Sequence, residues 1–358
     1  MPPRRPRLPG PDLRAARTQA YALAMAPFCF QAARAARQLG LLEQLRQAGA
    51  QGTTAAALSE GLQLPATSTE ALLDALLCVE LVAELEDGAW CLTTVGLTWL
   101  SDPALAVEVA FTHEVCWQGL FDMSESLAAA KPIGLRHLGP WPTIYEGLTQ
   151  LSPAARKAWF DYDHGHSDSA FAAALDHVAA SAPQQLLDVG ANTGRFALRA
   201  LARLNQTRLT LLDLPAQLAE AKAALSTAGL VERAQLQALD LLDHSIPFPS
   251  GQDAVWMSQF LDCFAPSDIQ ALLARAAACL NPGGSVWVLE CCPDRQSEEA
   301  ARICLRAASL YFIALANGVS RFYRSQTLID CAAAAGLRLA TSHDGLGSAH
   351  TLFRFVKA

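Results

Sequence analysis

The second half of the chain alternates short apolar runs with helical stretches, and this rhythm restricts the fold more than any other feature of the sequence. Helical stretches separate the first five runs, as in a parallel doubly wound sheet. A loop with Gly345 and Gly347 separates the last two, which predicts a closing hairpin. We therefore predict an α/β domain over residues 181–358 with a seven-stranded sheet, whose strands are 186–189, 209–214, 236–238, 254–258, 285–291, 337–342 and 351–356.

Residues 15–104 have a different composition: they are rich in alanine and therefore favour helix. The helices that we expect there end in a hairpin across Glu86-Asp87-Gly88, and Thr54 is a suitable N-cap for one of them. Three helices followed by a two-stranded wing predict a winged helix. Residues 1–14 are rich in proline and arginine and are expected to be a disordered tail. The expected elements are helices 20–40, 41–48, 55–61 and 68–80 and strands 81–83 and 90–92.

The charge of this region excludes the usual role of a winged helix, which is to read DNA. The candidate recognition helix 68–80 has three acidic residues and no lysine or arginine, and the first hundred residues contain no lysine. The whole chain has a formal net charge of -7. Because binding to phosphates needs a surplus of basic residues, we predict that residues 15–104 form a homodimer rather than bind nucleic acid.

Residues 105–180 are predicted to be a helical linker that lines a substrate pocket. Prolines and glycines interrupt the segment, and it is rich in imidazole and indole groups, which suit a pocket wall. The other interpretation is that these rings only pack between helices. The candidate pocket residues in the segment are His113, Trp117 and Trp159.

Cysteine spacing and hydropathy exclude several other classes of protein. The ten cysteines include no CxxC pair, so we expect neither a metal site nor a disulfide framework. Arginines before the apolar stretch 20–30 loosely resemble a signal peptide, but prolines, an aspartate and further arginines intervene. No segment has the roughly 18 continuous apolar residues of a membrane helix. We therefore expect a cytoplasmic protein with no membrane or nucleic-acid partner.

A glycine turn after the first predicted strand is the strongest local motif. The strand ends at Asp188, the turn Gly190-Ala191-Asn192-Thr193-Gly194 follows, and a helix is expected to begin near Thr193. Glycine lets the main chain turn sharply and approach a ligand. Asp213 ends the second strand and Asp240 follows the third. Three carboxylates at the carboxyl edge of one sheet indicate a nucleoside ligand, whose ribose hydroxyls one of them can bind.

With these motifs, the chain from about residue 18 to its end resembles the small-molecule O-methyltransferases of secondary metabolism, which join a winged-helix dimerisation domain to a Rossmann-like catalytic domain. The resemblance implies S-adenosylmethionine as cofactor and a small hydroxylated, phenolic or aromatic substrate. The loop from Asp188 to Gly194 would hold the methionine part of the cofactor, and Asp213 the ribose. The implied cofactor set is Asp188, Gly190, Asn192, Gly194, Asp213, Leu214, Asp240, Leu241 and Ser258, with Asn317 in a loop that walls the pocket.

The chain departs from the family pattern at the general base. The family motif after the fourth strand reads Leu-Lys-x-x-Leu-His-Asp-Trp, and this chain has Ser258 in place of the lysine and Asp262 in place of the catalytic histidine. We predict that His164 accepts the proton, helped by the carboxylates of Asp161 and Asp168, and that Asp262 orients the substrate. An adjacent carboxylate would raise the pKa of His164.

Several alternatives remain open at this stage. The enzyme could methylate a phenolic ring on carbon in a pigment pathway of the aryl-polyene type, instead of on oxygen. The missing histidine also fits a family member that binds the cofactor without methylating. A ligand sensor is disfavoured by the intact carboxylates, and a nicotinamide enzyme by the absence of a GxGxxG loop.

Overall fold

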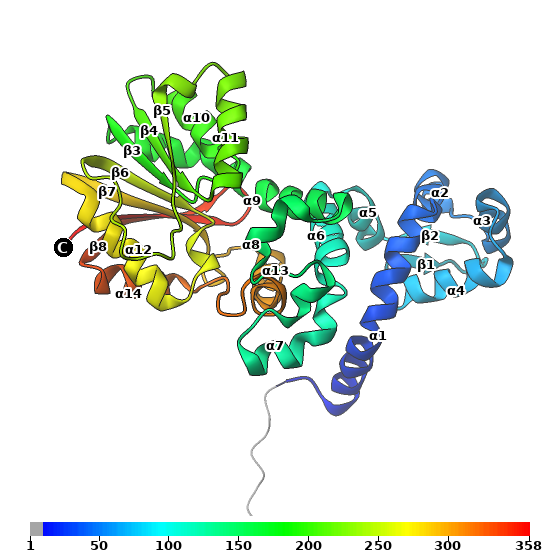
Figure 1. Ribbon diagram of the computed structural model, residues 1–358. Helices are drawn as coiled ribbons and strands as arrows, with labels where there is room; N and C mark the ends of the chain where they lie inside the picture. The colour runs from blue at the N-terminus through cyan, green and yellow to red at the C-terminus, as the bar shows by residue number, and fades with distance from the viewer. Residues whose placement is uncertain (1–9) are drawn as a thin grey trace, which may run out of the picture. The chain divides into compact units, whose positions relative to one another are not determined.

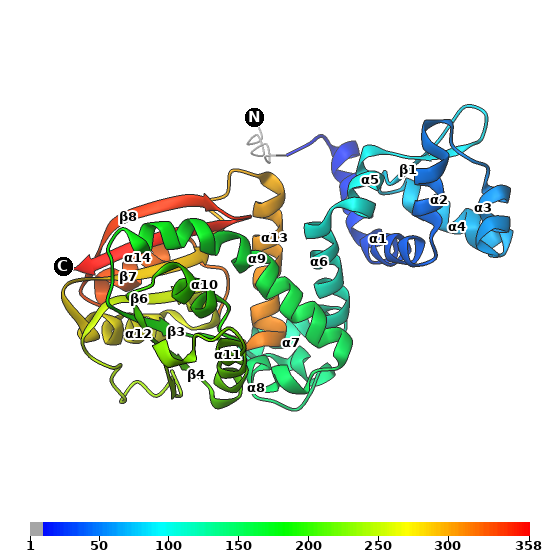
Figure 2. The same ribbon diagram turned by 90° about the horizontal axis from the view of Figure 1, so that it is seen from above.

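The computed structural model describes residues 10–358, which divide into two compact units at Val109 and Ala110 (Figures 1 and 2). The predicted boundary between residues 104 and 105 lies five residues before the observed one. Both boundaries fall within helix α6 (Pro103–Phe111). The region predicted as a disordered tail lies mostly outside the described residues, because residues 1–9 are not described. In the described part of the chain, no helix is long and apolar enough to cross a membrane.

The first unit consists of helices and one antiparallel hairpin. Its core gathers leucines from α2, α3 and α4 with Trp90 of the hairpin, and this order of three helices and a wing agrees with the winged-helix prediction. Thr54 caps α3 by accepting a hydrogen bond from the backbone N–H of Ala57 at 3.2 Å. The elements are α1 (Leu13–Gln38), α2 (Leu41–Ala48), α3 (Ala55–Leu62), α4 (Ala66–Leu77), β1 (Val82–Glu84), β2 (Trp90–Leu92) and α5 (Thr94–Ser101).

The helix boundaries of this unit differ from the predicted ones where a capping side chain or a residue with a positive φ sets the end of the helix. Helix α1 begins at Leu13 rather than at residue 20, because Asp12 accepts a hydrogen bond from the N–H of Ala15. It ends at Gln38, before Gly40, whose φ is 85°. Helix α4 begins two residues before the predicted Ser68 and stops three residues before Glu80, which has a φ of 56°.

The second unit is a sheet between two layers of helices, as predicted. Strand order is β5-β4-β3-β6-β7-β9-β8, with the first five strands parallel and β9 antiparallel to both of its neighbours. The strands are β3 (Gln185–Val189), β4 (Arg208–Asp213), β5 (Ala234–Ala238), β6 (Gln252–Ser258), β7 (Leu280–Cys291), β8 (Leu337–Leu346) and β9 (His350–Lys357). Residues 281–284 form a bulge in β7, because the pairing with β6 skips from Leu280 to Ser285.

Alternate side chains of the strands face the two helical layers. One core packs the sheet against α9 (Pro153–Ala179), α10 (Arg195–Arg203) and α11 (Pro215–Thr227). The other packs it against α12 (Pro266–Cys279) and α14 (Ser325–Ala334), as Figure 1 shows. The remaining helices, α7 (Met123–Ala129), α8 (Ile144–Gly147) and α13 (Glu299–Tyr311), belong to the same unit. Since the chain runs from β3 outward to β5 and then returns to β6, the strand order reverses beside β3, where such sheets bind ligands.

Candidate active site

A cavity of about 660 Å³ lies at the carboxyl ends of the parallel strands in the second unit. Its wall combines the ends of β3, β4 and β6 with α9 and the segment 311–322. Of the predicted cofactor residues, Asp188, Gly190, Asn192, Asp213, Leu214, Asp240, Leu241 and Ser258 line it. Gly194 does not line the cavity, but it ends the turn whose other members do.

The turn after β3 requires its glycines and its asparagine. Gly190 has a φ of 77°, and a Cβ atom there would lie 2.3 Å from the ring of Phe260. Asn192 has a φ of 47°, which is the left-handed geometry that asparagine tolerates best after glycine. Gly194, with a φ of 78°, precedes α10, so the helix begins at Arg195 rather than at the predicted Thr193.

Asp213 fastens this turn to the second strand. Its Oδ2 accepts a hydrogen bond from the N–H of Asn192 and its Oδ1 accepts one from the N–H of Leu214, both at 2.7 Å. Burial raises the pKa of Asp213, and these two bonds oppose that shift. Each oxygen keeps a further lone pair, so the carboxylate can also accept hydrogen bonds from a ribose.

Asp188 is the other buried carboxyl group at the turn. It is 2% exposed, and its Oδ2 has no hydrogen-bond partner among the described residues. Burial raises its pKa well above the usual value, and the nearby charge of Asp213 adds to the shift. Burial therefore favours the protonated form, which has an O–H to donate to a ligand.

Buried polar atoms without partners provide a test of the cofactor. Among the described residues that line the cavity, six side chains each leave one such atom: Tyr145, Gln217, Trp256, Asp188, Asn192 and Ser258. The last three belong to the predicted cofactor set. Unpaired buried polar atoms are rare in proteins and indicate a missing partner. Together with apolar Leu214 and Leu241, they fit a ligand that is polar at one end and flat and apolar at the other, as S-adenosylmethionine is.

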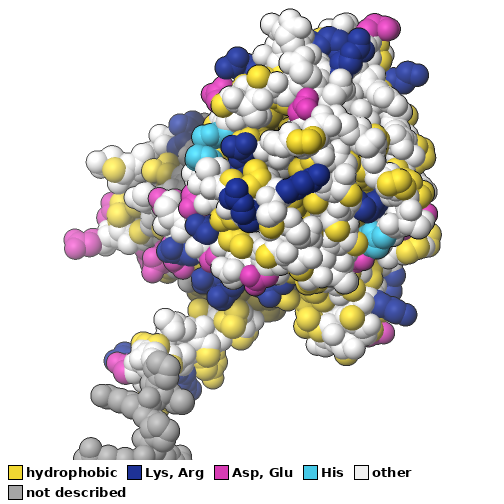
Figure 3. Space-filling view, turned by 90° about the vertical axis from the view of Figure 1, so that its left-hand side faces the viewer, with side chains coloured by type: hydrophobic (Ala, Val, Ile, Leu, Met, Phe, Trp, Pro, Cys, Tyr) yellow, Lys and Arg dark blue, Asp and Glu magenta, His cyan; other side chains and the backbone are white. Residues whose placement is uncertain are grey.

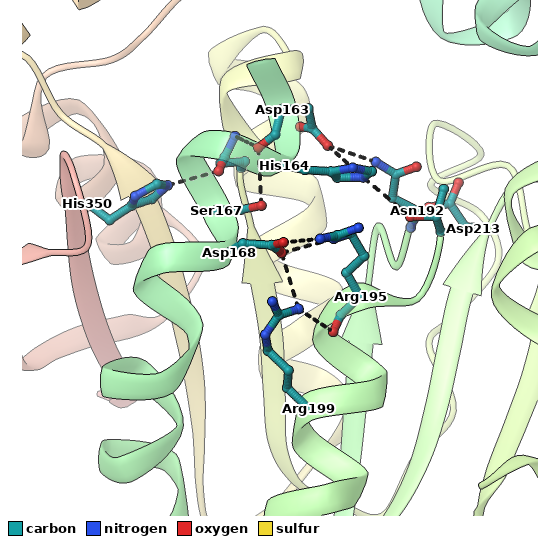
Figure 4. A network of polar contacts seen from close by, with 11 residues as sticks. Asp163, His164, Ser167, Asp168, Asn192, Arg195, Arg199, Asp213 and His350 are labelled. Atoms are coloured by element: carbon teal, nitrogen blue, oxygen red, sulfur yellow. Dashed lines mark hydrogen bonds and ion pairs between the residues drawn. The ribbon is translucent and has the colours of Figure 1, made fainter. Parts of the chain in front are cut away.

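Helix α9 contributes a network of polar contacts to the turn (Figure 4). The carboxylate of Asp163 accepts a hydrogen bond from Asn192 Nδ2 at 3.1 Å. Asp168 pairs with Arg195, whose Nε lies 3.0 Å from Oδ1, and with Arg199 at 3.2 Å. The network ties the helix to the residues that follow β3, so α9 positions the turn as well as lining the cavity.

The predicted partners of His164 are wrong. Asp161 pairs with Lys157 on the solvent side of α9, and Asp168 pairs with the arginines of α10. The imidazole lies 3.8 Å from Asp163 and 3.4 Å from the hydroxyl of Thr193. Its pKa falls to about 4 rather than rising, because burial and the charge of Arg195 outweigh the nearby carboxylates. At pH 7 the group is neutral and weakly basic.

Asp262 occupies the short 3-10 turn Leu261–Cys263 that follows β6. Its side chain lines the cavity and is 5% exposed. Burial raises its pKa to about 7, and the charge of Asp163 contributes. A carboxylate with that pKa is a much stronger base than an ordinary aspartate, whose pKa is about 3.9.

Glu290 of β7 holds this turn, and the sequence analysis missed it. Its Oε1 accepts hydrogen bonds from the N–H groups of Phe260 and Leu261 at 3.0 and 2.8 Å. The side chain is 2% exposed, and burial raises its pKa well above the usual value. A charged residue inside the apolar run of β7 was the available signal.

The other end of the cavity is aromatic. Trp159 Nε1 donates a hydrogen bond to the hydroxyl of Tyr311 at 2.8 Å, and the buried hydroxyl of Tyr145 faces the thiol of Cys263. Asn317 lines the cavity, but its amide bonds to the carbonyl of Cys263 and to Ser320, so it shapes the wall. Tyr145 and Tyr311 were not predicted.

His113 and Trp117 are not among the lining residues, contrary to the prediction. Their rings lie 6.4 Å apart, and the imidazole lies 4.0 Å from Glu114. His113 lies in the π-helical segment Thr112–Cys116, and Trp117 follows it. Phe111, the residue before this segment, does line the cavity.

Residues 143–337 match the model of the O-methyltransferase domain family, and this match covers more than half of the chain. The chain belongs to this family. The match confirms the predicted methyltransferase class and S-adenosylmethionine as its cofactor. The turn after β3 and all lining residues of the pocket except Phe111 lie within the matched region.

Two curated relatives are between a quarter and a third identical to this family member over the aligned residues. The L-tyrosine C(3)-methyltransferase of Streptomyces lavendulae is 28% identical over 299 residues, which cover 80% of this chain and 77% of the relative. The demethylspheroidene O-methyltransferase of Rhodobacter capsulatus is 27% identical over 272 residues. That alignment covers 74% of this chain but 64% of the relative, so the chain spans less than two thirds of that protein.

Solved structures show the same fold over nearly the whole chain. The S-adenosylmethionine-dependent methyltransferase SibL in its apo form superposes with a TM-score of 0.71 at 24% identity, covering 94% of this chain and 98% of that one. NcsB1 from neocarzinostatin biosynthesis, in complex with S-adenosylmethionine and 2-hydroxy-5-methyl naphthoic acid, gives 0.66 at 21% identity. It covers 92% of this chain and 96% of its own. These likenesses confirm the predicted fold class.

Proposed function

We propose that the protein transfers the methyl group of S-adenosylmethionine to a phenol, and that Asp262 accepts the phenolic proton. The observation that supports this most is the buried carboxyl group of Asp262, with a pKa of about 7, at the junction of the cofactor turn and the aromatic end. A general base is most effective when its pKa lies near the working pH. Asp262 therefore takes the role that the sequence analysis gave to His164.

Other residues of the chain position Asp262 and the aromatic ring of the acceptor. S-adenosylmethionine supplies an electrophilic methyl group on sulfur. Glu290 fixes the turn at Phe260 and Leu261, so the carboxylate of Asp262 is held toward the cavity. Trp159 and Tyr311, fastened to each other, offer a rigid wall for an aromatic ring. Such positioning supplies a large part of the rate, because methyl transfer from a sulfonium has a good leaving group.

The atoms balance for transfer to either oxygen or carbon. In O-methylation, the phenol oxygen gives its proton to Asp262, forms the bond to the methyl carbon and displaces the sulfur. In C-methylation, loss of the same proton makes the ortho carbon nucleophilic, and that carbon forms the bond to the methyl carbon and displaces the sulfur. The ring proton then leaves to solvent, and Asp262 returns its proton to the phenol oxygen. The family match favours O-methylation. Carbon is the second candidate, because the relative of 28% identity is named a tyrosine C(3)-methyltransferase.

Incubation with S-adenosylmethionine labelled with ¹³C in the methyl group tests the proposal. We expect at least one of a panel of phenols to gain the label, and the carbon chemical shift of the product separates a methoxy group from a ring methyl. Titration calorimetry with S-adenosylhomocysteine runs beside it. Tight binding with no labelled product from any phenol would instead support a family member that binds the cofactor without methylating.

We further propose that residues 15–104 mediate homodimerisation. Helix α1 exposes several large apolar side chains over residues 21–28, and Figure 3 shows hydrophobic groups along the described chain next to the grey residues. Exposed patches of this kind mark interaction sites. The exposed fractions are 62% for Tyr21, 76% for Leu23, 48% for Met25 and 72% for Phe28.

Light scattering at micromolar concentration should therefore give twice the mass of the 38.2 kDa chain. We expect the double variant Leu23→Glu/Phe28→Glu to give a single chain mass, because two buried charges cost more than the apolar contact contributes. A variant with Glu at exposed Ile303, in the other unit, is the matched control and should remain dimeric. A monomeric parent protein would refute the proposal.

Two finer points stay predictions. The pigment-pathway subgroup rests on the resemblance alone. The cytoplasmic location rests on the cysteine spacing and the hydropathy of the sequence.

A further inference from the structure

The ionisable residues that line the cavity are almost all acidic. Among the described residues that line it, two are basic, His164 and Arg195, and none is a lysine. The acidic set is Glu146, Asp163, Asp188, Asp213, Asp240, Asp262 and Asp268. Burial favours the protonated form of Asp188 and raises the pKa of Asp163 and Asp262 to about 7, so these three groups ionise only in part. The remaining carboxylates still outnumber the single net positive charge of the cofactor.

Neither basic residue is available to a negatively charged ligand. Arg195 forms a two-pronged ion pair with Asp168, which also holds Arg199. His164 is neutral at pH 7, because its pKa is lowered to about 4. A carboxylate on the acceptor would therefore enter the cavity beside carboxyl groups without a counter-ion, which is costly in a partly buried site.

Asp163 lies where the cofactor turn meets the aromatic wall. Its Oδ2 accepts the hydrogen bond from Asn192, and its side chain keeps 22% of its surface accessible. It is close enough to Asp262 and Tyr311 for its charge to raise the pKa of both groups. His164 Nε2 lies 3.8 Å from Asp163 Oδ2, on a neutral ring. Burial raises the pKa of Asp163 to about 7, and the charges of His166 and Arg195 oppose that shift only in part. A cation in the acceptor would supply the missing partner.

We propose that the acceptor is a phenol that carries a basic amine and no carboxylate, with its ammonium group beside Asp163 and its hydroxyl group at Asp262. This inference rests on the proposed function, because it places the reacting hydroxyl at Asp262. This charge preference would distinguish the chain from proteins that bind aromatic acids, such as NcsB1, which was solved with a naphthoic acid.

Calorimetric titration of the protein saturated with S-adenosylhomocysteine tests the charge preference without turnover. The ligands are tyramine, 4-propylphenol and 3-(4-hydroxyphenyl)propanoate, which share a ring and a short para chain ending in an ammonium, a methyl and a carboxylate group. L-Tyrosine, with both charges, is the fourth. We expect tyramine to bind at least about tenfold more tightly than the neutral phenol, and the acid to bind most weakly.

The variant Asp163→Asn assigns the preference to one residue. It should bring the affinities for tyramine and 4-propylphenol to within about threefold of each other. Glu146→Gln, at an exposed position of the same wall, is the matched control and should keep the preference. The affinity for S-adenosylhomocysteine is measured in each variant, so that a loss of cofactor binding is not mistaken for a loss of selectivity.

Several results would overturn the inference. These are an acid or L-tyrosine that binds as tightly as tyramine, a preference that survives in Asp163→Asn, or no binding by any of the four phenols. If tyramine binds preferentially but neither tyramine nor any other phenol receives a methyl group, the proposed function fails while the charge preference of the pocket stands. If the labelled methyl group reaches neutral or acidic phenols more readily than tyramine, the proposed function stands and this inference fails.

Discussion

Replacing Asp262 with asparagine should lower kcat by about 100-fold or more, because the variant keeps the shape of the side chain and loses the proton acceptor. Cofactor affinity should change little, since the contacts of the turn after β3 do not involve Asp262. Single-turnover assays with the best phenol measure the loss, and thermal melting by circular dichroism checks that the variant folds.

Two further variants test whether Asp262 or His164 is the proton acceptor. Asp262→His restores the residue that the family motif has at this position, and it should recover part of the lost rate. His164→Ala should lower kcat by no more than about tenfold, because a neutral ring with a pKa of about 4 is a poor proton acceptor. A large loss in His164→Ala together with parent activity in Asp262→Asn would reverse the assignment of the base.

Replacing Asp213 with alanine should weaken the binding of S-adenosylmethionine by about 100-fold. The substitution removes hydrogen bonds to the ribose, each worth about 1.5–3 kcal/mol when one partner is charged. It also frees the N–H groups of Asn192 and Leu214, which the carboxylate holds at 2.7 Å. Titration calorimetry gives the affinity.

The control for this variant is Asp330→Ala, an exposed aspartate of α14 that does not line the cavity and should leave the affinity unchanged. Asp213→Asn keeps one oxygen acceptor, so it should fall between alanine and the parent. Unchanged affinity in Asp213→Ala would remove the ribose assignment and weaken the case for the whole cofactor site.

The elements predicted best are those whose signals are local in sequence. The glycine turn was predicted because Gly190 and Asn192 must adopt a positive φ, a requirement that the residue types themselves reveal. Asp213 could be placed because the carboxyl ends of parallel strands meet at one edge of the sheet. The closing hairpin of β8 and β9 followed from two apolar runs around glycines.

The parts that could not be predicted depend on contacts between distant segments. The spacing of Asp161 and His164 suits a helical pair, but Lys157 on the same helix takes the aspartate. The low pKa of His164 comes from burial against the turn after β3 and from Arg195, which lies 31 residues later. Glu290 contacts the turn at Phe260 across 30 residues of sequence. Such partners become visible only when the sheet brings them together.

The aromatic candidates of the linker show the same limit. Trp159 and His113 belong to one helical segment by composition, yet only Trp159 lines the cavity, because the rotation of each helix about its axis decides which face points inward. A single sequence does not fix that rotation for a helix whose hydrophobic residues are spread around it. The pocket-lining face therefore needed the structure.

The pH dependence of kcat/KM for the acceptor tests most directly whether a buried carboxylate replaces the family's histidine. Asp262 acts in its ionised form, so the rate should rise with pH and level off above a break at about pH 7 or below. The break should be absent in Asp262→Asn, and it should remain at lower pH in Asp163→Asn, where a neighbouring negative charge is removed. A parent profile that breaks at the same pH as Asp262→Asn would contradict the account.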